Sequence, residues 1–250
     1  MISLQKFIFQ VFLYLVCIQD GFAGEIIFLR QNSEPKYFED PQTRKGLCDE
    51  IYMGLKSRLA KKALRVKIDH DRLPIKRILS RLELGTGHVF CGSGRNKKRE
   101  EKFIFSKKAV YSVSNKVAAH KSENFDPRNL QELARSEKVV GVLFGTSSAT
   151  FLKSVDGVAV YNKIYEIDQG LRLLNQNKVI RFFYYHDLGL NYYVKKKFPD
   201  LRVMSHKFRT VPQWLAISRS LKKADVMSIN EALDDLYKSG EIDRIWAKFF

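Results

Sequence analysis

The chain has 250 residues and carries 44 Lys and Arg against 27 Asp and Glu, which gives a formal net charge of +17 at pH 7. Its length is sufficient for one large domain or for two modest lobes that each bury a core. The basic residues form small scattered groups, not a stripe with interleaved aromatic residues, which argues against nucleic-acid binding. A positive field that attracts anionic solutes or an anionic membrane surface remains an alternative.

Residues 1–23 have the pattern of a secretory signal peptide. Lys6 gives a short positive start, and an apolar run follows from Phe7 to Ile18. Gly21 and Ala23 offer the small residues of a cleavage site. The run is too short for a comfortable transmembrane helix, so we expect export with cleavage after Ala23. A retained N-terminal anchor is the alternative.

The first half of the mature chain alternates short apolar runs with apolar residues at four-residue spacing, which predicts alternating strands and helices. Pro74 suits the first position of a helix, and Gly85 suits its end. The small residues Gly92, Ser93 and Gly94 then break a strand pattern. The predicted elements are a strand over 25–29, a helix from about 47, a strand around 66–68, a helix over 74–85 and a strand over 89–91.

The second half repeats this order and begins after Tyr111. Asp126 followed by Pro127 predicts a helix start, with Leu130 and Leu133 buried. Further expected elements are a strand over 139–144, a helix opened by 145–148, a strand over 158–161, a helix over 167–174, a strand over 179–185, a strand near 214–218 and two final helices. The alternation predicts an α/β fold with a mostly parallel sheet.

Cys48 and Cys91 are the two cysteines that remain after cleavage. An even pair in an exported chain suggests a disulfide. Cys48 lies near a predicted helix start and Cys91 near a predicted strand end, and both points can face the same side of the sheet. The alternative is two buried thiols that pack as small apolar groups.

The segment from Leu84 to Tyr111 carries a family resemblance. A helix end at Gly85 is followed by a short strand, by Arg99 and, at a set distance, by Phe105-Ser106. The chain then ends in S-I-N-E-A-L-D-D-L-Y-K-S-G-E-I-D-R-I-W-A-K-F-F. Over nearly all of residues 25–250 this order resembles the extracytoplasmic solute-binding proteins of family 3, polar amino-acid type.

The resemblance implies a two-lobed α/β fold of the periplasmic-binding-protein-like type II, with two hinge crossings. Lobe 1 is then expected over residues 24–110 and 211–250, and lobe 2 over residues 111–210. It also implies a periplasmic receptor, expected as a monomer, that closes around a small carboxylate-bearing or amino-acid-like ligand. Its expected partner is an ABC transporter permease or, alternatively, a membrane sensor.

Arg99 matches the position of the family's carboxylate-binding Arg. A guanidinium binds a carboxylate through two parallel, charge-assisted hydrogen bonds. The alternative is a surface Arg in a basic loop. Thr146 and Ser147 lie in a segment that resembles the family's second ligand contact, where free backbone N–H groups meet an anion. Plain N-capping of a helix is the alternative for these two residues.

Tyr37 lies in a segment that resembles the family's first ligand loop, and it is either a ligand contact or a core aromatic. Gly92 and Ser93 are placed to offer backbone and hydroxyl groups at a strand end. The family's Asp for a ligand α-amino group falls in direct register on Tyr185, while Asp187 comes two residues later. The ligand is therefore an amino acid held differently or a carboxylate without an amine.

Other chemistry has little support in the sequence. The five histidines show no metal-ligand spacing, and we expect neither a metal nor a cofactor. The family also includes cyclohexadienyl dehydratases, which eliminate water and carbon dioxide from a prephenate-like acid. That activity needs a general acid in the cleft, for which Glu39, Asp40 or Asp187 are candidates without a specific motif. We therefore expect a binding protein and not an enzyme.

Overall fold

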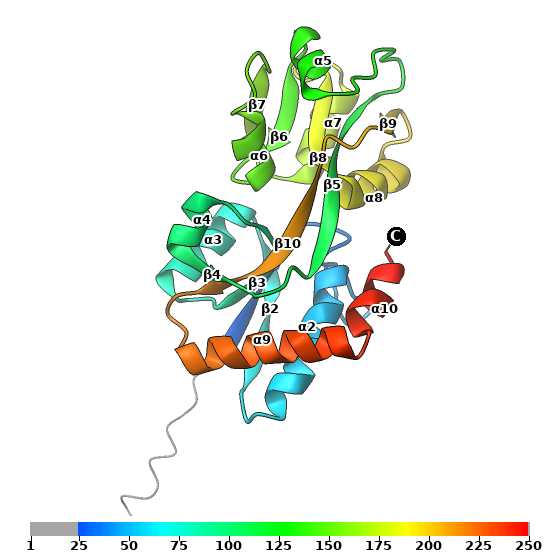
Figure 1. Ribbon diagram of the computed structural model, residues 1–250. Helices are drawn as coiled ribbons and strands as arrows, with labels where there is room; N and C mark the ends of the chain where they lie inside the picture. Colours follow the sequence, from blue (N-terminus) through cyan, green and yellow to red (C-terminus); the bar gives the residue numbers. More distant parts are fainter. Residues whose placement is uncertain (1–24, 250) are drawn as a thin grey trace, which may run out of the picture.

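The computed structural model describes residues 25–249. The predicted signal peptide over residues 1–23 lies outside this range. Within the described part of the chain, every helix is too short or too polar to cross a membrane. The described residues form two α/β halves, one above the other in Figure 1, with two long strands running between them.

The first half is built from β1 (Ile26–Gln31), α2 (Leu47–Ala60), β2 (Val66–Leu73), α3 (Ile75–Leu84), β3 (Val89–Gly94), α4 (Lys97–Lys102) and β4 (Phe103–Phe105). The apolar residues at four-residue spacing on α2 are all buried, because one face of the helix packs on the sheet. Gly85 ends α3 with a φ of 71°, a conformation that favours glycine. β3 continues through Gly94, three residues beyond the predicted strand end.

The second half contains β5 (Tyr111–His120), α5 (Leu130–Arg135), β6 (Val140–Leu143), α6 (Ser147–Leu152), β7 (Val160–Ile164), α7 (Ile167–Asn175), β8 (Phe182–His186), α8 (Asp187–Lys197) and β9 (Leu201–Val203). The helix start predicted at Asp126 was wrong. Asn129 caps α5 instead, and its side chain accepts the N–H of Glu132 at 2.8 Å. The aromatic strand begins at Phe182 and not at Val179.

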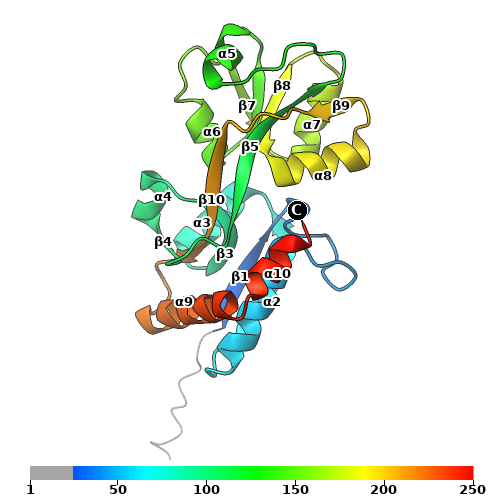
Figure 2. The ribbon, with the colours of Figure 1, turned by 45° about the vertical axis from the view of Figure 1, so that its right-hand side comes forward.

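The chain returns through β10 (Arg209–Ser218) to α9 (Lys223–Lys238) and α10 (Glu241–Ala247), which cover the first half (Figure 2). The strands form one path in the order β2-β1-β3-β10-β5-β8-β6-β7, with β4 on β10 and β9 on β5. β1 is parallel to β2 and β3, and β6 is parallel to β7 and β8.

The prediction of a mostly parallel sheet was wrong at its centre. β10 is antiparallel to β3 and β5, and β5 is antiparallel to β8. The reason is that β5 carries the chain out of the first half and β10 brings it back, so the two run in opposite directions. The sheet is therefore mixed, with its parallel pairs at the two ends.

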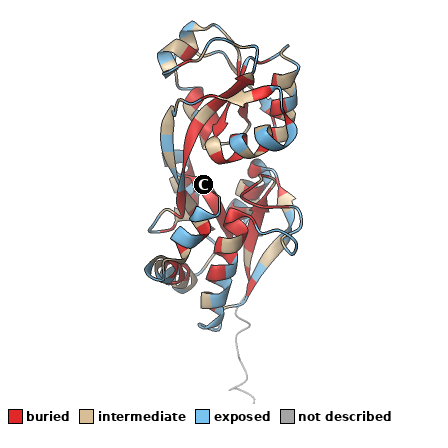
Figure 3. Ribbon diagram, turned by 90° about the vertical axis from the view of Figure 1, so that its right-hand side faces the viewer, coloured by how far each residue is buried: buried red, intermediate tan, exposed pale blue. Residues whose placement is uncertain are grey.

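Three apolar clusters form the core. One lies in the first half, and two lie on opposite faces of the sheet in the second half. Successive side chains of β8 point to opposite faces of the sheet. Phe183 and Tyr185 therefore belong to one cluster, and Phe182 and Tyr184 belong to the other. Buried segments follow the strands of both halves in Figure 3. The lobe boundaries near residues 110 and 211 stay a prediction that this division of the core supports.

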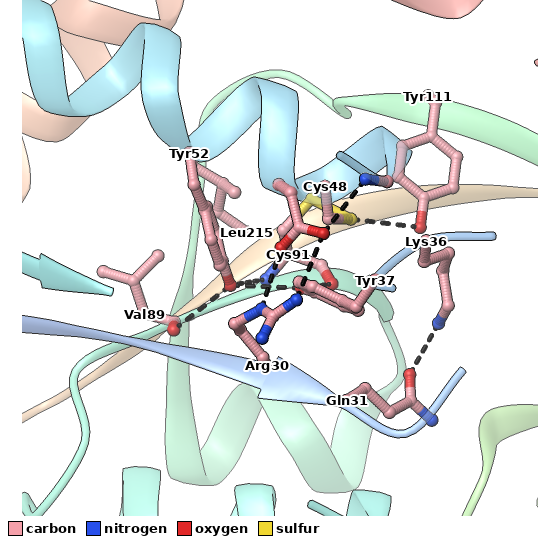
Figure 4. Close-up of a disulfide and its surroundings, with 12 residues drawn as sticks. Arg30, Gln31, Lys36, Tyr37, Cys48, Tyr52, Val89, Cys91, Tyr111 and Leu215 are labelled. Atoms are coloured by element: carbon pink, nitrogen blue, oxygen red, sulfur yellow. Dashed lines mark hydrogen bonds and ion pairs between the residues drawn. A yellow bond between two sulfur atoms is a disulfide. The ribbon is translucent and has the colours of Figure 1, made fainter. Parts of the chain in front are cut away.

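A disulfide joins Cys48 of α2 to Cys91 of β3, with Cα atoms 5.8 Å apart (Figure 4). The Oη of Tyr111 lies 3.7 Å from the Cys48 Sγ atom, and the carbonyl of Cys91 accepts the hydroxyl of Tyr37 at 2.8 Å. The bond fixes the N-terminal end of α2 against β3, the strand that leads into Gly92.

We expect removal of this disulfide to lower the free energy of unfolding by about 4 kcal/mol, because the bond closes a loop with a sequence separation of 43 residues. Urea unfolding with and without a reductant measures the effect. The Cys48→Ala/Cys91→Ala variant is the control, because its unfolding midpoint should not respond to the reductant. Equal midpoints for the oxidised and reduced wild-type protein would contradict the prediction.

Candidate functional site

A cavity of about 40 Å³ lies at the ends of β1, β3 and β8, between these strands, α4, the start of α6 and the crossing strands. The carboxyl ends of parallel strands are where α/β folds place ligand sites. The cavity is lined by residues from both halves of the molecule. Its longer polar side chains are Gln31, Lys36, Arg99, Asn115, His186 and Gln213.

Arg99 is buried in the wall of this cavity, with 8% of its surface exposed, so the alternative of a surface Arg does not hold. Its Nη1 donates to Ser93 Oγ at 3.2 Å and to the Gly94 carbonyl at 2.8 Å. Its Nη2 donates to the Gly145 carbonyl of the second half at 3.1 Å. Burial lowers the pKa of Arg99 to about 10, so the side chain remains a cation at neutral pH.

Thr146 and Ser147 both line the cavity. The Thr146 hydroxyl caps α6, because it accepts the Ala149 N–H at 3.1 Å and donates to the Leu143 carbonyl at 2.7 Å. Ser147 approaches the opposite wall so closely that a Cβ on Gly94 would lie 2.3 Å from its Oγ. The glycine therefore permits the two halves to meet at this point.

Gly92 and Ser93 are neighbours, but only Gly92 lines the cavity. Gly92 lines the cavity with a φ of 90°, and a Cβ there would lie 2.3 Å from the Tyr111 Oη, so a larger residue is excluded. Ser93 is buried behind the cavity wall and holds Arg99. Ser93 is thus placed to position the guanidinium and not to contact a ligand directly.

Tyr37 does not line the cavity. The prediction that it contacts the ligand was therefore wrong, and the alternative of a core aromatic residue holds. Its ring is fully buried, its hydroxyl donates to the Cys91 carbonyl at 2.8 Å, and its Oη lies 3.1 Å from the Oη of Tyr52. The loop turns this residue into the first apolar cluster and turns its neighbour Lys36 into the cavity. The reason is that adjacent loop residues point in different directions.

Tyr185 and Asp187 are also separated by the fold. Tyr185 lines the cavity, and its Oη lies 3.3 Å from the Oγ of Ser33 in the first half. Asp187 is the first residue of α8 and lies outside the cavity lining. Its Oδ1 accepts the N–H groups of Ser114 at 3.1 Å and of Leu188 at 2.8 Å. The carboxylate therefore ties β5 to α8 instead of facing a ligand.

Lys36 is the most consequential residue that the sequence analysis missed. It is 4% exposed, and its Nζ donates to Gln31 Oε1 at 2.6 Å. Burial, with the positive charge of Arg99 as a smaller cause, lowers the pKa of Lys36 to about 7. The only signal in the sequence was its position next to Tyr37 in the loop that resembles the family's first ligand segment.

His186 is the second missed residue. Its Nδ1 accepts the N–H of Gly189 at 2.9 Å, which assigns the ring proton to Nε2. Nε2 is buried and has no hydrogen-bond partner among the described residues. Burial, followed by the charge of Lys36, holds the pKa of His186 well below its usual value, so the ring is neutral.

Comparison with known proteins identifies the family. The profile of the bacterial extracellular solute-binding proteins, family 3, matches residues 27–250. The chain belongs to this family. A curated relative, an L-glutamate/L-aspartate-binding protein of Pseudomonas aeruginosa, is 23% identical over 189 residues, which are 74% of this chain. The match spans 61% of the length of that relative.

Solved structures show that this family 3 protein has a periplasmic-binding-protein-like type II fold. An ancestral arginine-binding protein bound to arginine matches with a TM-score of 0.77 and 20% identity, over 91% of this chain and 98% of that chain. The ancestral amino-acid-binding protein AncCDT-1, a precursor of cyclohexadienyl dehydratase, matches with a TM-score of 0.75 and 16% identity, over 91% and 95%. The predicted family and fold class are confirmed.

Proposed function

We propose that this protein is an exported solute receptor that closes two lobes around a small carboxylate-bearing ligand. The observation that supports it best is the buried guanidinium of Arg99 in the wall of a cavity lined from both halves. Three N–H groups of Arg99 are used in the bonds above, and a guanidinium has five. The remaining N–H groups can bind a carboxylate.

Contacts across the cavity support a mechanism of hinge closure. Arg99 reaches the carbonyl of Gly145, and Ser33 lies against Tyr185. A ligand held by groups from both lobes binds the closed form better than the open form, so it shifts the population toward closure. The two long crossing strands, β5 and β10, are the connections about which the lobes would move.

The same proposal includes the cellular setting. The protein would be exported by its signal peptide, act as a monomer in the periplasm and present its closed form to an ABC transporter permease or a membrane sensor. A relative described as an L-glutamate/L-aspartate-binding protein supports an acidic ligand for the site. The membership of the chain in family 3 supports a membrane transporter as the partner.

A dehydratase activity gains no support from the cavity. The candidate acids Glu39, Asp40 and Asp187 all lie outside its lining. Glu39 is exposed and has its carboxylate 3.9 Å from Arg72, and Asp187 is engaged by two backbone N–H groups. Elimination from a prephenate-like acid needs an acid near the carboxylate site. We therefore favour binding without turnover.

Thermal unfolding of the mature protein against amino acids, dicarboxylates and small inorganic anions tests the receptor function. A ligand that binds only the folded protein is expected to add about 2.7 kcal/mol of stability at a hundredfold excess over its Kd. An amine without a carboxylate, such as ethanolamine, serves as a negative control. A midpoint that no anion raises would exclude the receptor function for this cavity.

A further inference from the structure

We propose that the cavity selects a compact dianion without an ammonium group, either a short dicarboxylate or a tetrahedral oxyanion, held between Lys36 and Arg99. The proposal rests on the receptor function above and names its ligand class. The proposed dianion differs from an amino-acid ligand in one measurable respect, because it has no α-ammonium group.

The positive side of the site consists of two buried basic side chains in one small cavity. Lys36 and Arg99 are 4% and 8% exposed, and both line the space. Because two like charges in a low dielectric repel each other, burial and Arg99 lower the pKa of Lys36 to about 7, and an anion bound between the two side chains would favour the charged form of Lys36. A ligand with two negative charges neutralises the pair, whereas a zwitterionic amino acid with one net charge at most leaves an imbalance.

Neutral donors add to this preference. His186 is one of the residues that line the cavity. Its Nε2 carries the ring proton, is buried and has no hydrogen-bond partner in the described part of the chain. A buried donor without a partner is costly, and an acceptor oxygen on the ligand would satisfy it. Ser147 of α6, which comes from the second half like His186, also lines the cavity.

The cavity offers little that could accept an ammonium group. Its described lining contains no Asp or Glu. Two of its three side-chain amides already use their acceptor oxygens, since Gln31 Oε1 binds Lys36 at 2.6 Å and Asn115 Oδ1 binds Arg209 at 3.1 Å. A bound ammonium would be desolvated without a carboxylate partner and would face two cations, so it lowers the affinity.

Two acids that lie close in sequence to cavity residues have other partners. Asp187, the acid closest in sequence to the family's ammonium-binding position, accepts N–H groups from Ser114 and Leu188. Glu34 pairs with Arg72 at 3.3 Å. Figure 4 shows Lys36 directed at Gln31 beside the disulfide. Neither acid therefore supplies a carboxylate to the cavity lining.

Calorimetric titration with matched ligands tests the proposal. Succinate and aspartate share one dicarboxylate skeleton and differ by the ammonium group, and inorganic phosphate and sulfate represent tetrahedral oxyanions. We expect succinate, phosphate or sulfate to bind at least about tenfold more tightly than aspartate. The class that binds more tightly, dicarboxylate or tetrahedral oxyanion, identifies the kind of dianion that the site takes. Equal or tighter binding of aspartate would overturn the dianion proposal and leave the receptor function intact, and binding of none would overturn both.

The Lys36→Met variant tests the role of the second cation. It keeps an unbranched side chain in the buried site and is expected to weaken dianion binding by about 30-fold or more, as for removal of one buried partner of a charge pair. Lys56→Met, at an exposed position of α2, removes the same charge away from the cavity and should bind like the wild type. Unchanged affinity in Lys36→Met would contradict the proposal.

The pH dependence gives a further readout. The charged or titratable groups that surround Lys36 are Arg99 of α4, His186 of β8 and Tyr111 of β5. With a pKa of about 7, Lys36 loses its proton as the pH rises, while Arg99 stays charged. Succinate affinity should therefore fall from about pH 7 to about pH 9 in the wild type but not in Lys36→Met. The same pH profile for both proteins would refute the role of Lys36.

Discussion

Replacement of Arg99 by Ala is expected to weaken ligand binding by about 30-fold to several thousand-fold, which corresponds to about 2–5 kcal/mol. The guanidinium is buried, stays charged at neutral pH and lies in the cavity wall. Its loss removes a forked donor from the ligand and also the bond from α4 to the Gly145 carbonyl. Both the contact and the closed form are therefore weakened.

Calorimetric titration with the best ligand of the panel measures this effect. Arg95→Ala is a matched control, because Arg95 is a nearby Arg with 46% of its side chain exposed, paired with Glu100 and outside the cavity lining. Arg99→Lys keeps the charge but loses the fork, so its affinity should be intermediate. Wild-type affinity in Arg99→Ala, with normal affinity in Arg95→Ala, would refute a role for this guanidinium.

Replacement of Arg30 by Met is expected to lower the free energy of unfolding by about 3–5 kcal/mol, because it leaves a buried carboxylate without its partner. Arg30 is fully buried in β1, and its Nε donates to Asp49 Oδ1 at 2.8 Å. It also donates to the carbonyls of His70 and Phe38. This one side chain therefore joins β1 to α2, to β2 and to the loop before α2.

Urea unfolding of the disulfide-bonded protein measures the loss. Arg172→Met is the control, since Arg172 pairs with Asp168 on the surface of α7 and should cost less than about 1 kcal/mol. In the Arg30→Met/Asp49→Asn variant the buried charge is absent, so part of the stability should return. A loss in Arg30→Met no larger than that of Arg172→Met would show that the buried pair contributes little.

The placement of Arg99 illustrates what a family resemblance, combined with spacing along the chain, can predict. The residue follows the strand that ends at Gly94 and precedes Phe105 by a fixed distance, so a short connection had to bring it near the strand end. The hydroxyls of Thr146 and Ser147 were found in the same way, because a strand end and a helix start bound them on both sides. Local constraints thus fixed these positions.

The loop between β1 and α2 shows where this reasoning fails. Tyr37 and Lys36 are neighbours, and only Tyr37 was considered as a ligand contact, with a place in the core as its alternative. The structure buries Tyr37 against Cys91 and Tyr52, and it is Lys36 that lines the cavity. A loop has no period that assigns its side chains to a face, so their direction depends on what the rest of the chain packs against it.

The sequence by itself determined the family, the α/β class, most of the helices and strands and the place of Arg99. The family and the place of Arg99 came from the order and spacing of motifs that resemble family 3. The helices and strands came from periodicity and turn residues, which are local. The tertiary structure alone decided that β5 and β10 pair antiparallel, that Asp187 faces away from the cavity and that Lys36 and His186 line it. The physical reason is that these outcomes depend on which distant segments meet and which polar groups they satisfy there, and no local pattern records this.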